Sequence, residues 1–375
     1  MSIVIEKVNL LESKKDRKRF INLAWTLYKN DPSWVPHLKM EIEKLFNKNH
    51  PFYATADVAF WIATKDGKDV GRIMAIVNHN FIKFHDEQTG HYGFFEAHDD
   101  PTTFKALFNI AEEWLKSQGM NKMQGPFNPS TNYECGNLVL GHGERPVMMM
   151  PYNPEFYQTH IEGLGFEKAK DLVAYHLDSK FEMPEIIQKI SARAESKNNI
   201  TYRTISKKNW MKEVDLMYEI YNDAWEHNWG FIPMTKDEFY GTAGDLKMVA
   251  DERLILFALV DGKEVGFIVA LPDLNQVFQQ IPSGKLLPTG IFKFLNAKKY
   301  MTGVRVLTMG VKQEYRKYGL ASILYQRCHQ NILKYPKYKT IEMSWILEDN
   351  LNMNKPLLRM NAKPYRKYRI FEKGI

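Results

Sequence analysis

The chain has 375 residues, of which 44% are hydrophobic and 25% are charged, a composition typical of a folded globular protein and not of a disordered one. Its formal net charge of +7 favours anionic partners, such as phosphate groups, nucleic acid or an anionic membrane surface, without choosing among them. Two cysteines exclude a disulfide framework, no apolar run could cross a bilayer and the first residues lack an apolar signal core, so we expect a cytoplasmic protein and leave contact with the inner face of the membrane open.

A strand–turn–strand signal in the first half of the chain recurs in the second half. Residues 59–78 read AFWIATKDGKDVGRIMAIVN, and residues 254–273 read LILFALVDGKEVGFIVALPD. Asp-Gly between two apolar runs predicts a β-hairpin, because glycine supplies the positive φ that a tight turn needs. The shared turn and the constant offset, which pairs Asp66 with Asp261, favour an internal duplication.

The elements around each hairpin also correspond: an aromatic-rich helical stretch precedes it, and a strand, a helix and a short strand follow. We expect these elements at 21–28, 92–97, 104–117 and 122–124 in the first copy, and at 218–229, 304–311, 319–333 and 340–344 in the second. A polar stretch after Pro184 separates the copies. The sequence therefore predicts an α/β (α+β) fold with two domains, 1–180 and 199–375, joined by a linker at 181–198. Each would hold a mixed, mainly antiparallel sheet flanked by helices.

A short loop at 125–136 gathers the polar side chains of Asn128, Ser130, Thr131, Asn132, Glu134 and Cys135. Two interpretations stay open. The loop is either a turn-rich connector, or a substrate pocket, since function is often carried on loops. In the second case Asn128, Ser130, Asn132 and Cys135 would bind substrate. Cys135 has no histidine nearby in the sequence, so a buried thiol is favoured over a nucleophile.

The segment 274–303, which follows the second hairpin, is longer than its counterpart 79–91 and contains no acidic residue. It carries apolar residues and lysines, namely Leu286, Leu287, Ile291, Phe292, Phe294, Leu295, Lys285, Lys293, Lys298 and Lys299. A basic, apolar-faced segment suits an anionic membrane surface or a lipid-binding lid. The alternative is a helix that covers the sheet and leaves its lysines in solvent.

The next strand, VRVLTMGV at 304–311, leads through KQEYRKYGLA into a helical run. A loop that enters a helix N-terminus presents unpaired backbone N–H groups and the positive end of the helix dipole. Gly319 allows the backbone to approach a phosphate closely, and Lys312, Arg316 and Lys317 add positive charge. The sequence therefore predicts a pyrophosphate site here.

At these residues the chain resembles the GNAT acyltransferase superfamily, whose coenzyme A motif, Q/R-x-x-G-x-G/A, is matched by Arg316, Gly319 and Ala321. The resemblance implies an acyl-CoA site formed by Met309, Gly310, Val311, Arg316, Lys317, Tyr318, Gly319, Leu320, Ala321 and Asn350. The first copy departs from the motif, because adjacent Asp99 and Asp100 would repel a pyrophosphate. We therefore expect one coenzyme site per chain, with the first copy shaping the acceptor side.

Nearly the whole chain is also similar to a bacterial family of double-GNAT proteins that includes bacterial ceramide synthases. The similarity is densest at 125–136 (GPFNPSTNYECG) and 148–157 (MMMPYNPEFY). This second resemblance implies N-acylation of a long-chain sphingoid base.

Attack by an amine requires a base, because a free amine has a pKa of about 10 and is protonated at neutral pH. Glu134 and Glu342 are the candidates, and for each of them a surface or structural carboxylate is the alternative. Many GNAT members use a tyrosine of the last helix as general acid. The corresponding stretch at 357–360 reads LLRM, which puts acid catalysis by a side chain in doubt.

Other kinds of site have no support in the sequence. There is no C-x-x-C, H-E-x-x-H, EF-hand or Walker motif and no nucleic-acid recognition motif, so we expect neither a metal nor a nucleic-acid partner. The leading hypothesis is an acyl-CoA-dependent N-acyltransferase. The alternatives are a small-molecule or peptide N-acetyltransferase, and a non-catalytic coenzyme A-binding or membrane-associated scaffold. Acyl chain length, acceptor, oligomeric state and the use of acyl carrier protein as donor are not indicated.

Overall fold

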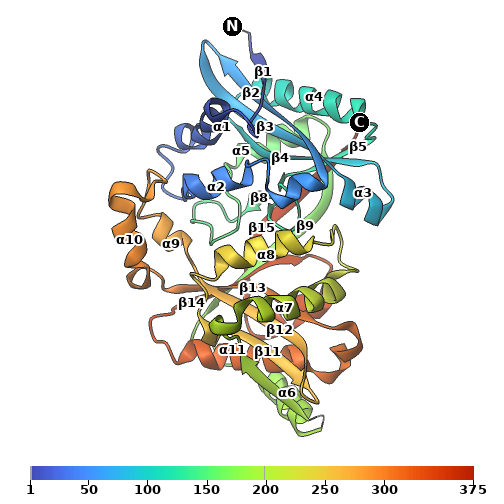
Figure 1. Cartoon of the computed structure of the whole chain (residues 1–375), viewed down its shortest axis with the longest axis vertical. Coiled ribbons are helices and arrows are strands. Elements are labelled where there is room, and N and C mark those ends of the chain that lie inside the picture. The colour runs from blue at the N-terminus through green and yellow to red at the C-terminus, as the bar shows by residue number, and fades with distance from the viewer. Residues whose placement is uncertain (1, 198) are drawn as a thin grey trace. The chain divides into compact units, whose positions relative to one another are not determined.

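The computed structural model describes residues 2–197 and 199–375, which fold into two compact units. The first unit comprises Met1–Leu172, Phe278–Leu295 and Arg366–Ile375, and the second comprises Val173–Val277 and Asn296–Tyr365. The last ten residues therefore belong with the N-terminal part of the chain. In Figure 1 the red C-terminal strand lies among the blue and green strands of the first unit. The domain boundaries expected at 180 and 199 stay a prediction.

The sheet of the first unit contains the duplicated hairpin. Its strands are β1 (Val4–Val8), β2 (Ala56–Lys65), β3 (Lys68–Asn78), β4 (Thr89–Ala97), β5 (Lys122–Gly125) and the last residues of β15 (Lys363–Gly374). Strands β1 to β4 are antiparallel, β4 and β5 are parallel, and β5 and β15 are antiparallel. The hairpin turns at Asp66 and Gly67, both at positive φ, as the Asp-Gly pair requires.

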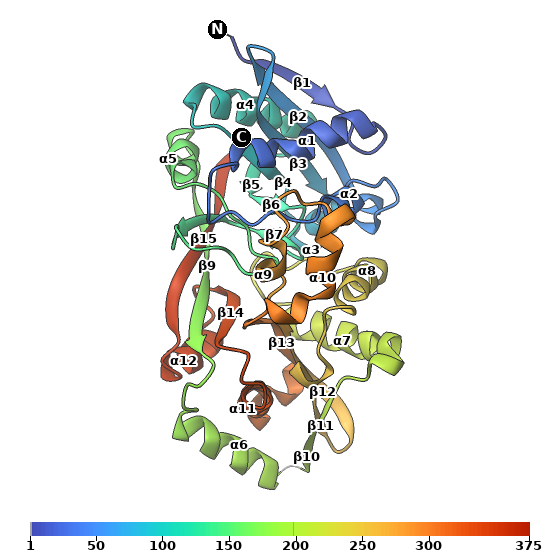
Figure 2. The ribbon, with the colours of Figure 1, turned by 90° about the vertical axis from the view of Figure 1, so that its left-hand side faces the viewer.

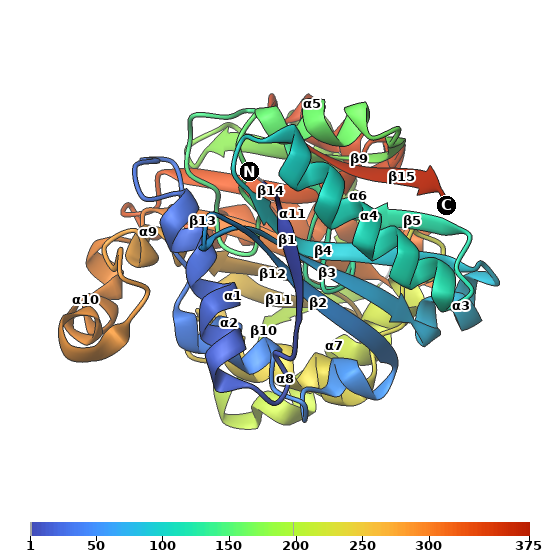
Figure 3. The same ribbon diagram turned by 90° about the horizontal axis from the view of Figure 1, so that it is seen from above.

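Helices cover both faces of this sheet (Figure 3). They are α1 (Lys14–Leu27), α2 (Lys39–Leu45), α3 (His79–His85), α4 (Pro101–Ser117) and α5 (Phe156–Gly163). Phe20 and Phe46, from α1 and the end of α2, pack on one face of the sheet, against Phe60. Phe108 of α4 belongs to the aromatic core on the other face. The first unit is therefore a three-layered structure with two apolar cores.

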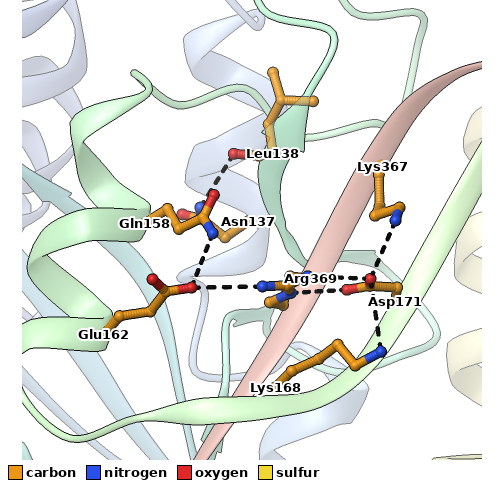
Figure 4. A network of polar contacts seen from close by, with 8 residues as sticks. All are labelled: Asn137, Leu138, Gln158, Glu162, Lys168, Asp171, Lys367 and Arg369. Atoms are coloured by element: carbon orange, nitrogen blue, oxygen red, sulfur yellow. Dashed lines mark hydrogen bonds and ion pairs between the residues drawn. The ribbon is translucent and has the colours of Figure 1, made fainter.

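An ion-pair network holds the C-terminal strand in the first unit (Figure 4). Asp171 of β9 (Glu167–Asp178) is 1% exposed. Arg369 of β15 donates from Nε to Oδ1 of Asp171 at 2.8 Å and from a terminal nitrogen to Oδ2 at 3.2 Å. Lys367 and Lys168 lie 3.5 and 3.9 Å from the same carboxylate. Burial raises the pKa of Asp171, but the hydrogen bonds and charge of Arg369, with both lysines, outweigh it, so the pKa lies below its ordinary value.

Replacing Asp171 by alanine is expected to lower the free energy of unfolding by about 3 kcal/mol at pH 7, because Arg369 loses a buried partner. A carboxylate whose pKa is lowered by folding stabilises the fold above its unfolded-state pKa, and this contribution is lost as pH falls through the folded-state pKa. The difference between variant and wild type should therefore shrink in acid. Urea unfolding at pH 7 and at about pH 3 measures it. The exposed pair of Asp57 and His79 provides the control, since Asp57→Ala should change stability by less than about 1 kcal/mol.

The second unit repeats the sheet order. Its strands are the end of β9, β10 (Ile200–Thr204), β11 (Ile255–Val260), β12 (Lys263–Pro272), β13 (Gly303–Val311) and β14 (Thr340–Leu347). Strands β10 to β13 are antiparallel, whereas β13 and β14 are parallel, as β4 and β5 are in the first unit. The hairpin turn at Asp261 and Gly262 again has positive φ at both residues. The predicted mixed sheets flanked by helices are confirmed in both units.

The helices of the second unit are α6 (Glu185–Lys197), α7 (Trp210–Trp225), α8 (Lys236–Leu246), α11 (Leu320–Leu333) and α12 (Leu351–Arg359). Figure 2 shows α7 and α11 on opposite sides of β11, β12 and β13. Leu324 and Cys328 of α11 are buried in the core that α11 forms with the sheet. Burial raises the pKa of Cys328 to about 12. Along the described residues, no helix combines the length and apolarity that a membrane span requires.

Candidate functional site

The motif strand β13 changes its surroundings half-way along. Residues 303–306 pair in parallel with 340–343 of β14, and the register ends there although β14 continues to Leu347. On its other edge β13 stays paired with β12 as far as Val311. Within the described chain, residues 307–311 therefore have a neighbouring strand on one side only. Their backbone groups on the β14 side are placed to bind a ligand.

A β-bulge reverses the faces of β13 at this point. The register with β12 shifts between Val269 and Ala270. Val306 lies before the shift and Met309 beyond it, yet both pack on the core beneath α11. Gly310 faces α7, where an added Cβ would lie 3.2 Å from the Cβ of Ala224. The bulge therefore reverses which residues of β13 face α11 and which face α7 between the paired half and the open half of the strand.

The loop after β13 ends at an uncapped helix. Residues 313–318 form a 3₁₀ turn, and Gly319, at φ +77°, is the N-cap of α11, which has no side-chain cap among the described residues. The Gly319 carbonyl accepts from the N–H groups of Ser322 and Ile323, so the N–H groups of Leu320 and Ala321 lie ahead of the first donors of the helix, where the helix dipole places partial positive charge. Arg316 and Lys317 are exposed beside it.

The loop is held by the C-terminal end of α7. The backbone N–H of Gln313 donates to Oδ1 of Asp223 at 2.7 Å, and the Gln313 side chain donates to the Asp223 carbonyl at 3.1 Å. Arg316 donates to the carbonyl of Ala224 at 2.6 Å. On another side, an added Cβ at Gly319 would lie 3.2 Å from Ile190 of α6. Arg316 therefore fixes the loop as well as adding positive charge to it.

The equivalent helix start in the first unit is filled by its own side chain. Asp100 is the N-cap of α4 and accepts from the backbone N–H of Thr102 at 3.0 Å. It also accepts from Thr103 and from Lys65, each at 3.0 Å. The hydrogen bonds of Thr102 and Lys65 hold the pKa of Asp100 well below its ordinary value, so a fixed negative charge occupies this helix end. One coenzyme site per chain stays a prediction.

A buried polar cluster lies where β13 and β14 separate. Glu342, 3% exposed, stands opposite Arg305, one residue pair before the register ends. Ser344 donates to Oε1 of Glu342 at 2.6 Å, and the hydroxyl of Tyr365 donates to Oε2. Arg305 donates to the carbonyl of Ser344 at 3.0 Å. The ring of His176 lies 5.6 Å from that of Tyr365.

A small gap in the apolar core, with room for about one water molecule, lies beside the same point on the α11 face of the sheet. Its walls include Val306 and Met343, the last register pair of β13 and β14. The rest of the lining consists of Phe181, Met183, Ile268, Tyr325, Cys328, His329, Ile332, Ile341 and Met360.

The structure brings only part of the predicted site together. The motif residues and Glu342 all belong to the second unit. Asn350 is the N-cap of α12 and accepts from the backbone N–H of Met353 at 3.3 Å, which gives it a structural task. The sequence alone does not predict the parts played by Tyr365, Arg305 and Ser344, because the family resemblance points to a tyrosine in the last helix. No local signal could have found Tyr365, because it reaches Glu342 from the last strand.

The predicted acceptor loop belongs to the first unit, and its polar side chains contact one another or neighbouring residues of that unit. It contains β6 (Phe127–Asn128) and β7 (Glu134–Cys135), which pair with each other, and β8 (Asn137–Leu140) follows. Asn128 accepts from the backbone N–H of Phe94 at 2.6 Å, and Ser130 accepts from that of Asn132 at 3.2 Å. Cys135 is buried, and Glu134 lies 3.6 Å from His37. A role for these residues in binding or catalysis remains a prediction.

Comparison with known proteins identifies the family. No model of a known protein family matches the chain. Protein YghO of Escherichia coli strain K12 is 37% identical over 371 residues, 97% of this chain and 94% of that protein. The bacterial ceramide synthase of Caulobacter vibrioides is 35% identical over 372 residues, 97% of this chain and 96% of that protein. The chain belongs to the bacterial ceramide synthase-like family.

Solved structures agree on the fold of this family member. A tandem GNAT protein from the clavulanic acid biosynthesis pathway superposes with a TM-score of 0.59 at 11% identity, over 100% of this chain and 98% of that one. A GCN5-related N-acetyltransferase from Sphaerobacter thermophilus gives 0.54 at 12% identity, over 99% and 95% of the two chains. The predicted tandem GNAT fold is confirmed, and the chain is an acyltransferase. Its described residues hold no group of three or more His, Cys, Asp or Glu that could bind a metal ion.

Proposed function

We propose that this chain is an acyl-CoA-dependent N-acyltransferase whose acceptor is a long-chain amine of the sphingoid-base type. The observation that carries the proposal is the combination, in the second unit, of an uncapped helix start after Gly319 with a buried carboxylate, Glu342, where β13 and β14 separate. The first arrangement suits a pyrophosphate, and the second suits removal of a proton from an attacking amine.

Successive residues of the second unit would bind successive parts of acyl-CoA. The N–H groups of Leu320 and Ala321, with the exposed Lys317, would hold the pyrophosphate. The one-sided backbone of residues 307–311 would hold the pantetheine arm by strand-like hydrogen bonds. Bound acyl-CoA supplies a thioester carbonyl that an amine can attack.

Glu342 is the proposed base and Tyr365 the proposed proton donor. The neutral amine, formed when the ammonium group releases one proton to solvent, bonds through its nitrogen to the carbonyl carbon while the carbon–sulfur bond breaks. The amine proton passes to Glu342, and the leaving sulfur takes a proton from the hydroxyl of Tyr365, which its hydrogen bond to Glu342 reprotonates. A backbone N–H at the bulge of β13 would stabilise the negative charge on the carbonyl oxygen.

The relative named bacterial ceramide synthase supports the acceptor class. A ceramide carries its acyl group on the nitrogen of a long-chain base, so an enzyme that makes one must accept a hydrophobic amine. Two alternatives differ in what they predict. A small-molecule or peptide acetyltransferase would prefer acetyl-CoA and polar amines, and a coenzyme A-binding scaffold would bind acyl-CoA without turnover.

The experiment is incubation of the full chain with acyl-CoAs from two to about eighteen carbons and either sphinganine or polar amines, with products identified by mass spectrometry. We expect N-acyl sphinganine as the product. Transfer only from acetyl-CoA to polar amines would overturn the acceptor assignment. Binding of acyl-CoA with no product from any amine would support the scaffold instead.

A further inference from the structure

The segment Phe278–Leu295 of the first unit carries the most concentrated exposed apolar side chains of the described chain. It follows α9 (Asn275–Phe278) and includes α10 (Ile291–Leu295). Leu287, Phe292 and Leu295 are 73%, 66% and 73% exposed. A helix that covered the sheet would bury these side chains. The residues of the segment that are buried are Ile281, Gly284 and Gly290.

The segment is fixed to α1 and α2, so its apolar side chains are held outward by ordered structure. The indole nitrogen of Trp25 donates to the carbonyl of Pro282 at 3.0 Å, and the backbone N–H of Lys39 donates to the carbonyl of Gly284 at 2.9 Å. Gly284 adopts φ +65°, and a Cβ there would collide with Trp25. In Figure 2 the orange segment adjoins α2 accordingly.

Lysines gather beside these apolar side chains. Lys18 and Lys285 are exposed, whereas Lys39 is half-buried, with its ammonium group 2.5 Å from Oδ1 of Asn22 and 4.2 Å from the centre of the Trp25 ring. Burial, together with the charges of Lys285 and Lys18, lowers the pKa of Lys39 below its ordinary value, and Glu43 opposes the shift. Lys293 adds a further cation on α10, and residues 278–295 include no acid. Met40 of α2 is also exposed. Apolar side chains and clustered lysines on one surface are what an anionic bilayer selects.

We propose that this surface, formed by Leu287, Phe292 and Leu295 with the exposed Lys18 and Lys285, docks on an anionic lipid bilayer. The three apolar side chains would enter the boundary between headgroups and acyl chains, and the lysines would meet the lipid phosphates. A protein partner is disfavoured, because lysines are depleted at protein–protein interfaces. The inference concerns the first unit and is independent of the proposed chemistry of the second.

The test is sedimentation of the full chain with vesicles of phosphatidylcholine alone and of phosphatidylcholine with phosphatidylglycerol. We expect binding to the anionic vesicles that weakens as salt rises. The triple variant Leu287→Ser, Phe292→Ser, Leu295→Ser should bind at least about tenfold more weakly. The double variant Lys18→Glu, Lys285→Glu should lose most of the preference for anionic lipid and its salt dependence.

A matched control distinguishes binding through this surface from nonspecific binding through any exposed apolar side chains. The triple variant Met211→Ser, Met248→Ser, Leu333→Ser removes exposed apolar side chains of the second unit and should bind vesicles as the wild type does. Thermal melting checks that all variants fold. The proposal is overturned if the wild type ignores anionic vesicles, or if both triple variants lose binding equally. It is also overturned if the docking-surface variant binds normally but changes the oligomeric state, since this face would then join two copies of the chain.

Discussion

Replacing Glu342 by glutamine is expected to lower kcat about 10²- to 10⁴-fold, the range that general-base catalysis contributes. Glutamine keeps the shape of the side chain and can still accept a hydrogen bond, but it cannot take a proton from the attacking amine. The neighbours of Glu342 make it a base held in one orientation, because Ser344 and Tyr365 each bind one of its oxygens. Steady-state kinetics of the variant measure the loss.

Two further variants decide whether Glu342 acts as a base or only supports the fold. Tyr365→Phe removes the hydrogen bond to Glu342 and should lower kcat less than Glu342→Gln does, with little change in KM. Glu134→Gln tests the other candidate, a partly exposed carboxylate of the first unit. The assignment is wrong if Glu134→Gln abolishes turnover while Glu342→Gln retains it. It is equally wrong if Glu342→Gln loses activity only by unfolding, as thermal melting would reveal.

Features that depend on neighbours in the sequence could be predicted. The hairpin turns at Asp66 and Asp261 need only an Asp-Gly pair between apolar runs. The helix start at Gly319 could be predicted because an apolar strand, a polar loop and a helical pattern of apolar residues follow one another in the sequence. The duplication supplied what one copy alone could not. It aligned Asp100 with the motif loop, and the structure shows that this carboxylate caps its own helix.

Features that join distant residues could not be predicted. Tyr365 binds Glu342 from another strand, and Arg369 binds Asp171 although 198 positions separate them. Such pairs depend on strand order, and one sequence without its fold carries no signal for that order. The exposed segment 278–295 is similar, because its apolar residues suit either a covering helix or an outer surface. Their exposure follows from how Trp25 and Lys39 hold the segment.

Replacing Gly319 by valine is expected to weaken coenzyme A binding about 10- to 100-fold. A valine at φ +77° is strained, and its side chain would press on Ile190 of α6, so the start of α11 must move. The N–H groups of Leu320 and Ala321 would then no longer point at the pyrophosphate. Losing one hydrogen bond to a charged group costs about 1.5–3 kcal/mol of binding free energy. Isothermal titration with coenzyme A measures the change.

Gly262 offers a control that separates the effect of the location of Gly319 on coenzyme A binding from the effect of backbone strain on stability. It has φ +79°, close to that of Gly319, but no atom lies within 4 Å of its added Cβ, and it sits in the hairpin turn of the same unit. Gly262→Val should therefore lose similar stability and keep its affinity for coenzyme A. Asp100→Asn, at the filled helix start of the first unit, should also leave affinity unchanged. Equal affinity in wild type and Gly319→Val would move the pyrophosphate away from α11. A loss of affinity in Asp100→Asn would mean that the first unit binds the coenzyme as well.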